Sequence, residues 1–385
     1  MRRISFDELE AKLADPELPD ARIRPYLRGV AEASGPFDPV VQPDPDRVEL
    51  RPLDAVRIER LDFLGWANSW ARWRRQQRFL RRLERGESLP LLVSEGDSWF
   101  QFPLLLDDTI DQLAERYLIW SLDAAGDTLA HMTGVDAEYP GALLDQRLGG
   151  RVRGLLLSAG GNDIIGTETD AQGREVSILA SILHPRTPGR DPAWHVDTEG
   201  LARRLAEIET GYRRVLETVA AIRPGTFVVC HGYAHAVPAF DGDPRRPSWT
   251  RHGGWLRRPL ESRGFLDPRE QRAIVAFLID RLYELLARLC GGNRAGGAYP
   301  FAYLVDCRPL LDERDWADEI HPTDAAGRGF AKVARAFERV IEEALVAHTL
   351  PARAAALPTG LRLRRRTRGT AGRPTAPTPA RTGEA

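Results

Sequence analysis

Five short apolar runs, separated by longer stretches of helical pattern, occupy the chain from residue 91 onward. The runs are Leu91–Ser94, Tyr117–Leu122, Gly154–Ser158, Thr226–Cys230 and Ala302–Val305. Each run is too apolar to leave one face of a strand in water, so we expect a parallel sheet with helices on both faces. The pattern therefore predicts an α/β fold. Its helices are expected near 107–116, 199–223, 268–290 and 324–347, the last with Thr323 as its cap.

The composition narrows the class of protein. The 54 basic and 55 acidic residues balance, so no general attraction to nucleic acid is expected. No stretch approaches the roughly 18 apolar residues of a transmembrane helix, and the first residues turn acidic before an export signal could form. The three cysteines are widely spaced, which argues against a disulfide framework. We therefore predict a cytoplasmic protein without a transmembrane segment.

Three regions are expected along the chain. Residues 1–88 form an N-terminal extension, in which Ser5 and Glu8 match a capping box and 55–85 has the pattern of one long helix. Residues 89–350 form the main domain, with insertions near 164–198 and 232–267 that exceed the length of ordinary loops. Residues 351–385, rich in Arg, Pro, Thr and Ala, are predicted to be a disordered basic tail.

Two features of these regions leave alternatives open. One face of the long helix carries Arg72, Arg74, Arg75, Arg78, Arg81, Arg82 and Arg85. This face is either the solvated side of a docked helix or a surface for an acidic partner or an anionic membrane. The insertion near 232–267 carries Phe240, Trp249, Trp255 and Phe265. It either forms a lid over a pocket or packs away from it.

Polar residues collect where the predicted strands end. These segments are Gly96-Asp97-Ser98, Asp123-Ala124-Ala125-Gly126, Gly160-Gly161-Asn162-Asp163 and, before the last helix, Asp318-Glu319-Ile320-His321. Ligands of open parallel sheets bind beyond the carboxyl ends of the strands, so we expect these segments to meet at one rim.

The residue types at this rim fit nucleophilic catalysis. A serine hydroxyl becomes a useful nucleophile when an imidazole takes its proton and a carboxylate orients that imidazole. Ser98 is the candidate nucleophile, His321 the base and Asp318 the orienting group. Taken singly, each segment could be ordinary turn or capping chemistry. Their order and placement together make a hydrolase or acyl transferase the leading hypothesis.

With these four segments, the chain resembles the SGNH (GDSL-type) hydrolase superfamily over about residues 89–347. Gly96-Asp97-Ser98 matches its first block, Gly126 its second, Gly160-Gly161-Asn162-Asp163 its third and Asp318–His321 its fourth. Trp99 stands where leucine is common, and Ala124 stands where the family often has asparagine. The resemblance implies a three-layer flavodoxin-like fold with strand order 2-1-3-4-5. It also implies the three roles given above, and an oxyanion hole formed by the Ser98 and Gly126 amides and the Asn162 side chain, with Asp97 and Asp163 in support.

The predicted function is hydrolysis of a carboxylic ester, on a small molecule or an acylated conjugate, through an acyl-enzyme on Ser98. The alternative is a catalytically silent binding or scaffold protein that engages an acidic partner. Neither a metal nor an organic cofactor is expected. His231 and His235 follow a strand without an evident third ligand, so a metal site is disfavoured and one or both are interpreted as residues that line the site.

Overall fold

The computed structural model describes residues 2–30, 41–52, 54, 63–148, 150–238 and 255–348. The predicted tail at 351–385, the first part of the predicted long helix and the insertion residues Phe240 and Trp249 lie outside these ranges.

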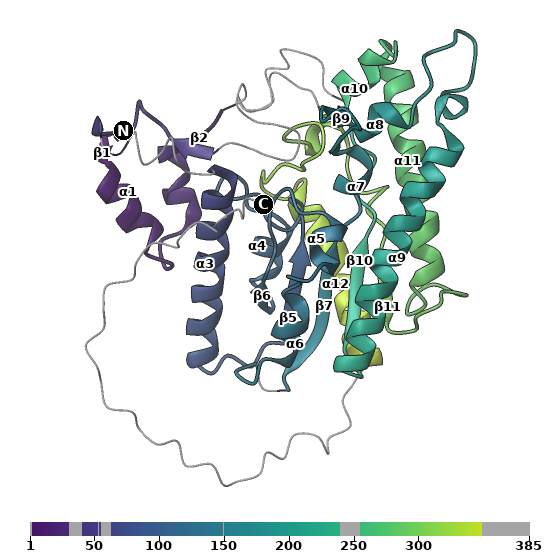
Figure 1. Ribbon diagram of the computed structural model, residues 1–385. Helices are drawn as coiled ribbons and strands as arrows, with labels where there is room; N and C mark the ends of the chain where they lie inside the picture. The colour runs from purple at the N-terminus through teal and green to yellow at the C-terminus, as the bar shows by residue number, and fades with distance from the viewer. Residues whose placement is uncertain are drawn as a thin grey trace.

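A five-stranded parallel sheet forms the centre of the molecule (Figure 1). Its strands are β5 (Leu91–Gly96), β6 (Leu118–Ser121), β7 (Val152–Ser158), β10 (Phe227–His231) and β11 (Ala302–Val305). They lie in the order β6-β5-β7-β10-β11, and each neighbouring pair is parallel. Counted along the chain this order is 2-1-3-4-5, so the predicted α/β fold and its strand order are confirmed.

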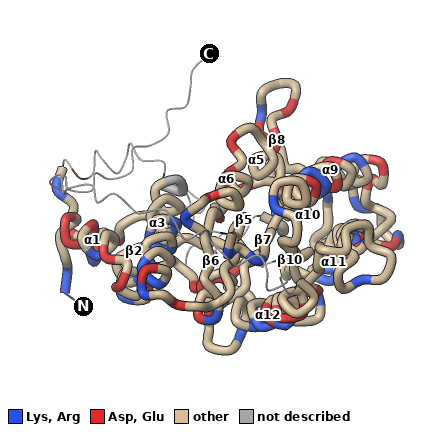
Figure 2. The backbone as a smooth tube through the Cα atoms, turned by 90° about the horizontal axis from the view of Figure 1, so that it is seen from below, with Lys and Arg blue, Asp and Glu red and all other residues tan. Residues whose placement is uncertain are grey.

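Helices cover both faces of the sheet (Figure 2). One layer holds α4 (Thr109–Leu113) and α12 (Phe330–Ala347), and the other holds α5 (Leu129–Thr133), α6 (Tyr139–Leu144), α9 (Thr198–Ile222) and α11 (Pro268–Leu289). The connection from β5 to β6 runs in one direction along the sheet, and the later connections run in the other. Because parallel crossovers are right-handed, this reversal places the helices on opposite faces. The rim where the direction reverses lies beyond the ends of β5 and β7.

The last helix begins six residues later than the sequence pattern predicted. Its N-cap is Gly329 instead of Thr323, and residues 324–329 form turns. Gly327 and Gly329 have φ values of 72° and 43°, in the left-handed region that a helix cannot include. Thr323 instead donates its backbone N–H to Asp315 and accepts one from Phe330. From Phe330 onward, the buried side chains follow the predicted helical spacing.

The N-terminal part of the described chain packs beside strand β6. It contains β1 (Ile4–Ser5), α1 (Phe6–Leu13), β2 (Leu27–Gly29), β3 (Val41–Pro43), β4 (Val48–Glu49) and the long helix α3 (Phe63–Glu84). The predicted Ser5–Glu8 capping box is present at α1. Helix α3 stands along the β6 edge of the sheet, as Figure 1 shows.

The arginine-rich face of α3 is largely bonded within the protein, so a solvated face is the wrong interpretation for most of it. Arg74 is fully buried and donates to the carbonyls of Lys12, Leu13 and Asp15. Arg72 donates to the carbonyls of Leu122 and Asp123, and Arg82 to those of Ala114 and Tyr117. A periodic pattern of charges does not reveal that the carbonyls of a neighbouring segment will face it.

The connection after β7 holds short elements. They are α7 (Asn162–Ile165), the hairpin of β8 (Thr167–Thr169) and β9 (Glu175–Ser177), and α8 (Ile178–Ser181). The described end of the next insertion forms α10 (Arg257–Ser262), which packs against α8. None of the described helices is long and apolar enough to cross a membrane.

Candidate active site

The turn after β5 presents Ser98 at the rim. Gly96 ends the strand where no side chain would fit, because a Cβ there would lie 2.6 Å from the Phe100 ring and 2.9 Å from Ser158 Cβ. Asp97 then accepts the Trp99 amide at 3.0 Å, and its carbonyl accepts the amides of Phe100 and Gln101. This tight turn holds the Ser98 side chain in place.

Ser98, His321 and Asp318 form one chain of hydrogen bonds, although 223 residues separate the serine from the histidine. Ser98 Oγ lies 2.8 Å from His321 Nε2, and His321 Nδ1 lies 2.7 Å from Asp318 Oδ2. The second carboxylate oxygen of Asp318 accepts the backbone amides of Ile320 and His321 at 2.9 and 2.7 Å. The carboxylate accepts a hydrogen bond from Nδ1–H and so keeps the proton on Nδ1, which leaves the lone pair of Nε2 facing the serine hydroxyl.

Aromatic rings enclose the His321 imidazole. Phe102 meets it edge-on with ring centroids 4.5 Å apart, and Trp255 does so at 5.1 Å. Trp99 Nε1 donates to the carbonyl of Ile320 at 2.8 Å, which ties the nucleophile turn to the histidine loop. These contacts keep bulk water from the imidazole and fix the plane of its ring.

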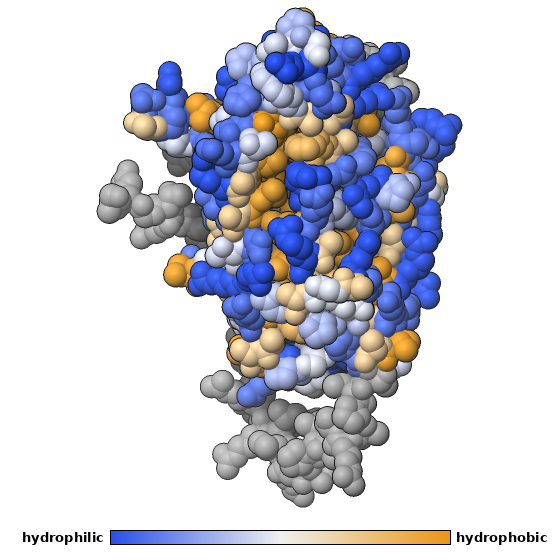
Figure 3. Space-filling view, turned by 90° about the vertical axis from the view of Figure 1, so that its right-hand side faces the viewer, coloured by the Kyte–Doolittle hydropathy of each residue, from blue (hydrophilic) through white to orange (hydrophobic). Residues whose placement is uncertain are grey.

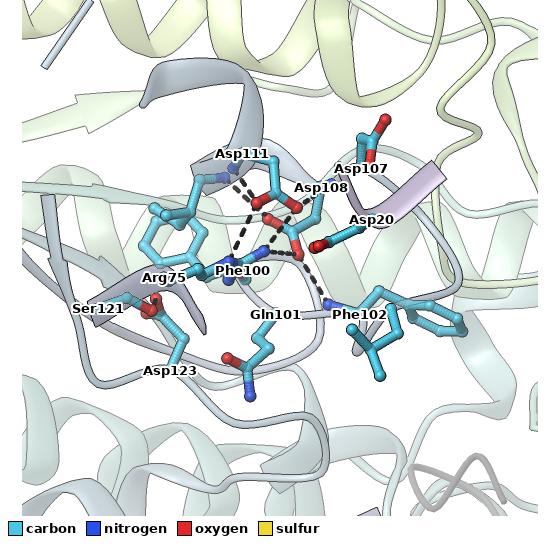
Figure 4. A network of polar contacts seen from close by, with 12 residues as sticks. Asp20, Arg75, Phe100, Gln101, Phe102, Asp107, Asp108, Asp111, Ser121 and Asp123 are labelled. Carbon is cyan, nitrogen blue, oxygen red and sulfur yellow. Dashed lines mark hydrogen bonds and ion pairs between the residues drawn. The ribbon is translucent and has the colours of Figure 1, made fainter. Parts of the chain in front are cut away.

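Arg75 holds the segment that follows the nucleophile turn (Figure 4). This guanidinium, from α3 and only 9% exposed, donates to the carbonyl of Phe100 at 2.7 Å and pairs with Asp108 and Asp111. Asp108 in turn accepts the amide of Phe102 at 2.9 Å. Since Phe102 packs on His321, the extension contributes to the placement of the imidazole.

The three predicted oxyanion donors lie in three segments, which follow β5, β6 and β7. Ser98 and Asn162 line the same hollow. Gly126 does not line this hollow, but its neighbour Asp127 accepts a hydrogen bond from Asn162 Nδ2 at 2.7 Å. Among the hydrogen bonds of the described residues, none is donated by the backbone amide of Ser98 or Gly126. Gly126 has φ of 83°, a conformation that favours glycine.

The two predicted supporting aspartates both hold backbone around these donors. Asp163 accepts the amide of Leu129 at 3.1 Å, just beyond the Gly126 turn. Burial raises the pKa of Asp163. Burial also raises the pKa of Asp97 to about 6, against the opposing effect of its hydrogen bonds from Tyr233, Trp99 and Ser158.

A second serine–histidine pair lies beneath the first. Ser158, at the end of β7, and His231, at the end of β10, are fully buried, with Ser158 Oγ 2.8 Å from His231 Nε2. Ser158 Oγ also lies 2.7 Å from Asp97 Oδ1. His231 Nδ1 accepts the amide of Tyr233 at 3.2 Å, so Nε2 carries the proton and donates it to Ser158. Burial lowers the pKa of His231 to about 3.

The hydrogen-bond order separates this inner trio of Asp97, Ser158 and His231 from the outer one. The Ser158 hydroxyl donates to the Asp97 carboxylate and receives a hydrogen bond from the imidazole, so its proton does not face an imidazole lone pair. The inner trio has the residue types of a catalytic triad, but it lacks the order in which a carboxylate orients a base. His231, interpreted from the sequence as a residue that lines the site, instead lies inside the core.

Sequence reasoning missed three residues that build the site. Glu319 accepts the amides of Trp255, Leu256 and Arg257 at 2.7–3.0 Å, which anchors the end of the second insertion beside His321. Tyr233 donates its hydroxyl to Asp97 and accepts the Gly161 amide at 3.1 Å. Asn68, on α3, pairs with the backbone of Ala125. Only Glu319, inside the fourth block, stood at a position that could have drawn attention.

The hollow beside Ser98 is almost wholly apolar. Its volume is about 640 Å³, part of it open to solvent. Its apolar walls come from α7, α8, α11 and the segments near Tyr233 and Leu256, and include Ile164, Leu179, Ala234, Val275, Leu278 and Leu282. Figure 3, which views the right-hand side of Figure 1, shows apolar residues gathered in the upper half of that face.

The described residues contain no group of three or more His, Cys, Asp or Glu side chains placed to hold a metal ion. His235, the other member of the pair considered from the sequence, lies 3.1 Å from Asp280. The cysteines Cys230, Cys290 and Cys307 are buried and form no disulfide.

No family model and no curated protein sequence matches the chain. Among solved structures, the chain is similar to an extracellular lipase of Streptomyces rimosus (14% identity, TM-score 0.37, 65% of this chain and 99% of the lipase). It is also similar to a phospholipase A1 of Streptomyces albidoflavus (13%, TM-score 0.37, 66% and 100%). A protein of Bacteroides ovatus described as a GDSL-like lipase matches at 12% identity and a TM-score of 0.29, over 67% of this chain and 54% of its own.

These similar structures include two proteins described as GDSL-like lipases. Similarity at this level of identity and TM-score assigns neither a substrate nor a residue role to this chain.

Proposed function

We propose that the protein is a serine hydrolase that cleaves a carboxylic ester through an acyl-enzyme on Ser98. The observation that carries this proposal is the hydrogen-bond chain from Ser98 Oγ through His321 to Asp318, at 2.8 and 2.7 Å. Its order is the one that lets an imidazole remove the serine proton while a carboxylate holds the ring. The apolar hollow beside Ser98 gives the substrate a place to bind.

The reaction proceeds in two halves. His321 Nε2 takes the Ser98 proton as Oγ attacks the carbonyl carbon, and the carbonyl oxygen becomes an oxyanion. The bond to the alcohol oxygen then breaks, and His321 returns its proton to that oxygen. A water molecule next gives a proton to His321 as its oxygen attacks the acyl carbon. The bond between that carbon and Ser98 Oγ then breaks, His321 returns the proton to Oγ, and the acid is released. Oxyanion donors contribute because their hydrogen bonds strengthen as charge develops, each by about 2.7–4 kcal/mol.

The lining of the hollow favours an apolar acyl group. Each methylene group that leaves water contributes about 0.8 kcal/mol, or roughly fourfold in binding. We therefore expect kcat/KM for p-nitrophenyl esters to rise from acetate to octanoate. Leu278, a buried residue of α11, lines the hollow, so Leu278→Trp should lower kcat/KM for the octanoate and spare the acetate. Equal loss on both esters would contradict the assignment of the hollow as the acyl site.

Labelling with a fluorophosphonate ester tests the nucleophile directly. The probe reacts with an activated serine, and peptide mapping by mass spectrometry then locates the adduct. We expect one adduct, on Ser98, and no labelling of Ser98→Ala with its fold intact. An adduct on Ser158, or unchanged labelling of Ser98→Ala, would overturn the proposal.

The alternative, a silent scaffold that uses the arginine helix to bind an acidic partner, has little support. Arg72, Arg74, Arg75 and Arg82 already donate to backbone carbonyls or aspartates of the same chain. A cytoplasmic location stays a prediction from the sequence.

A further inference from the structure

The backbone amide of Gly126 belongs to the same peptide unit as the carbonyl of Ala125. This unit is trans, like every other peptide of the described chain, so its N–H and C=O point in opposite directions. Whatever holds the Ala125 carbonyl therefore also decides where the Gly126 N–H points.

Asn68 of helix α3 holds this carbonyl. Its Nδ2 donates to Ala125 O at 3.1 Å, and its Oδ1 accepts Ala125 N at 3.0 Å. One side-chain amide thus pairs with both polar backbone groups of Ala125, as a neighbouring strand would. Because the carbonyl faces α3, the Gly126 N–H faces away from α3.

The peptide unit that contains the Ser98 amide is held in the same manner. The carbonyl of Asp97 accepts the amides of Phe100 and Gln101 at 3.0 and 2.9 Å, so the Ser98 N–H points away from that turn. The side chain of Gln101, itself fully buried, donates to Asn68 Oδ1 at 3.0 Å. Gln101 therefore links the two peptide units. Its backbone N–H holds the carbonyl of Asp97, and its side chain holds Asn68, which in turn holds the carbonyl of Ala125. Figure 4 shows Gln101 beside Phe100 and Phe102, in the segment that follows the nucleophile turn.

We propose that Asn68 is a positioning residue of the active site, which orients the Gly126 amide as an oxyanion donor. This inference rests on the proposed function. Helix α3 of the N-terminal extension then contributes to catalysis, although none of the four sequence blocks includes it.

The chemistry of the side chain supports this role. An oxyanion donor lowers the barrier when it is already aimed at the developing charge, so that no reorientation is needed during the reaction. A hydrogen bond to the Ala125 carbonyl also polarises the peptide and strengthens its N–H as a donor. Asparagine offers the required donor and acceptor together without a charge, whereas a carboxylate would repel the Ala125 carbonyl.

The experiment compares Asn68→Ala with Gln76→Ala, a matched control. Gln76 lies eight residues further along α3 and donates its side-chain amide to the carbonyl of Ser121 at 3.0 Å. Asn68→Ala loses three side-chain hydrogen bonds and Gln76→Ala loses one, but both variants loosen α3 from the segment at the end of β6, and only Asn68 touches the peptide unit of Gly126. Thermal unfolding midpoints measure the common structural cost.

Two readouts separate orientation of the donor from simple docking of the helix. The first is kcat and KM for p-nitrophenyl octanoate, and the second is the Ki of an octyl trifluoromethyl ketone, which forms a tetrahedral oxyanion on a serine. We expect Asn68→Ala to lower kcat by about 10- to 100-fold with little change in KM, and to raise Ki by a similar factor. Gln76→Ala should stay within about threefold in both readouts.

Asn68→Asp provides a second test if the alanine variant does not fold. It keeps the size and the acceptor atom but loses the donor to the Ala125 carbonyl, so the same losses of kcat and inhibitor affinity are expected. A folded Asn68 variant with wild-type kcat and Ki would overturn the inference, as would equal losses in Gln76→Ala.

The failure of the proposed function would give a different result. In that case the wild-type protein would not be labelled by the fluorophosphonate, and the positioning role would fall with the function. Labelling of wild-type Ser98 together with unaffected Asn68 variants would overturn the positioning role alone.

Discussion

Two buried hydrogen-bond chains in this protein contain a serine, a histidine and an aspartate, and they run in opposite senses. In the outer chain, Asp318 holds Nδ1 of His321, and Nε2 faces the hydroxyl of Ser98. In the inner chain, the carboxylate of Asp97 accepts a hydrogen bond from the hydroxyl of Ser158, and the imidazole of His231 donates a hydrogen bond to the Ser158 oxygen. The outer serine also lines an apolar hollow, whereas the inner one does not.

The difference shows that residue types alone do not define a catalytic triad. The serine of a triad is activated when its proton faces the lone pair of the imidazole. In the inner chain the serine proton faces a carboxylate instead, and the imidazole nitrogen next to the serine carries a proton of its own. The inner chain also holds Tyr233 and the turn that contains Ser98. We interpret the inner chain as a structural network that fixes the position of the outer chain.

The two serines give the largest expected contrast. Ser98→Ala should lower kcat/KM for p-nitrophenyl octanoate by about 10⁴-fold, because the residual rate then comes from binding and the oxyanion donors alone. Ser158→Ala should stay within about tenfold of wild type, and lose about 1–3 kcal/mol of unfolding free energy because His231 and Asp97 lose a partner. The measurements are steady-state kinetics and urea unfolding. A reversed order of the two activities would make the inner chain the catalytic one.

Replacement of Asp318 should lower activity, whereas replacement of Asp97 should mainly lower stability. Asp318→Asn leaves the site in place but favours the wrong tautomer of His321, so kcat should fall by about 10³- to 10⁴-fold with a normal unfolding midpoint. Asp97→Asn should act mainly on stability, since an amide cannot accept from all three donors that surround Asp97. Steady-state kinetics and thermal unfolding of both variants make the comparison. If Asp318→Asn kept wild-type kcat, the orienting role would be wrong.

His231, the histidine of the inner chain, should make the free energy of unfolding depend on pH. Burial lowers the pKa of His231 from 6.5 to about 3, so the folded protein keeps this imidazole neutral while the unfolded chain protonates it. Its contribution to stability is therefore complete above pH 6.5 and is lost as the pH falls toward 3. The unfolding free energy of wild type relative to His231→Gln should drop by roughly 3 kcal/mol between pH 7 and pH 4. Urea unfolding at both pH values measures this, and a constant difference would mean that His231 is not buried as a neutral ring.

The smallest expected effect concerns the ring that covers the outer imidazole. Trp255 meets His321 edge-on at 5.1 Å, and such aromatic pairs contribute about 0.5–1.5 kcal/mol. Trp255→Leu should therefore reduce kcat/KM by about two- to tenfold. Trp194→Leu, which removes a half-exposed tryptophan that packs on His195, should leave kcat/KM unchanged. Equal kinetics of the two variants would show that the Trp255 ring plays no part at the rim.

Much of the main domain was predictable because its signals are local. The five strands lie where uniform apolar runs were found, and their order follows from the four-block resemblance. The meeting of Ser98, Asp318 and His321 follows from strand ends that share one rim. The start of the last helix was missed because two glycines at positive φ outweigh the helical spacing of the residues around them.

The sequence by itself determined the layers of this protein, the rim at which polar residues gather and the identity of the residues proposed for catalysis. The tertiary structure alone decided that a second serine, Ser158, donates to a carboxylate, where the arginines of α3 find their carbonyl partners, and that Asn68 lies against Ala125, 57 residues away. The physical reason is the range of the forces involved. Periodicity along a chain reports burial of its own segment, whereas the direction of a hydrogen bond depends on partners that only folding brings together.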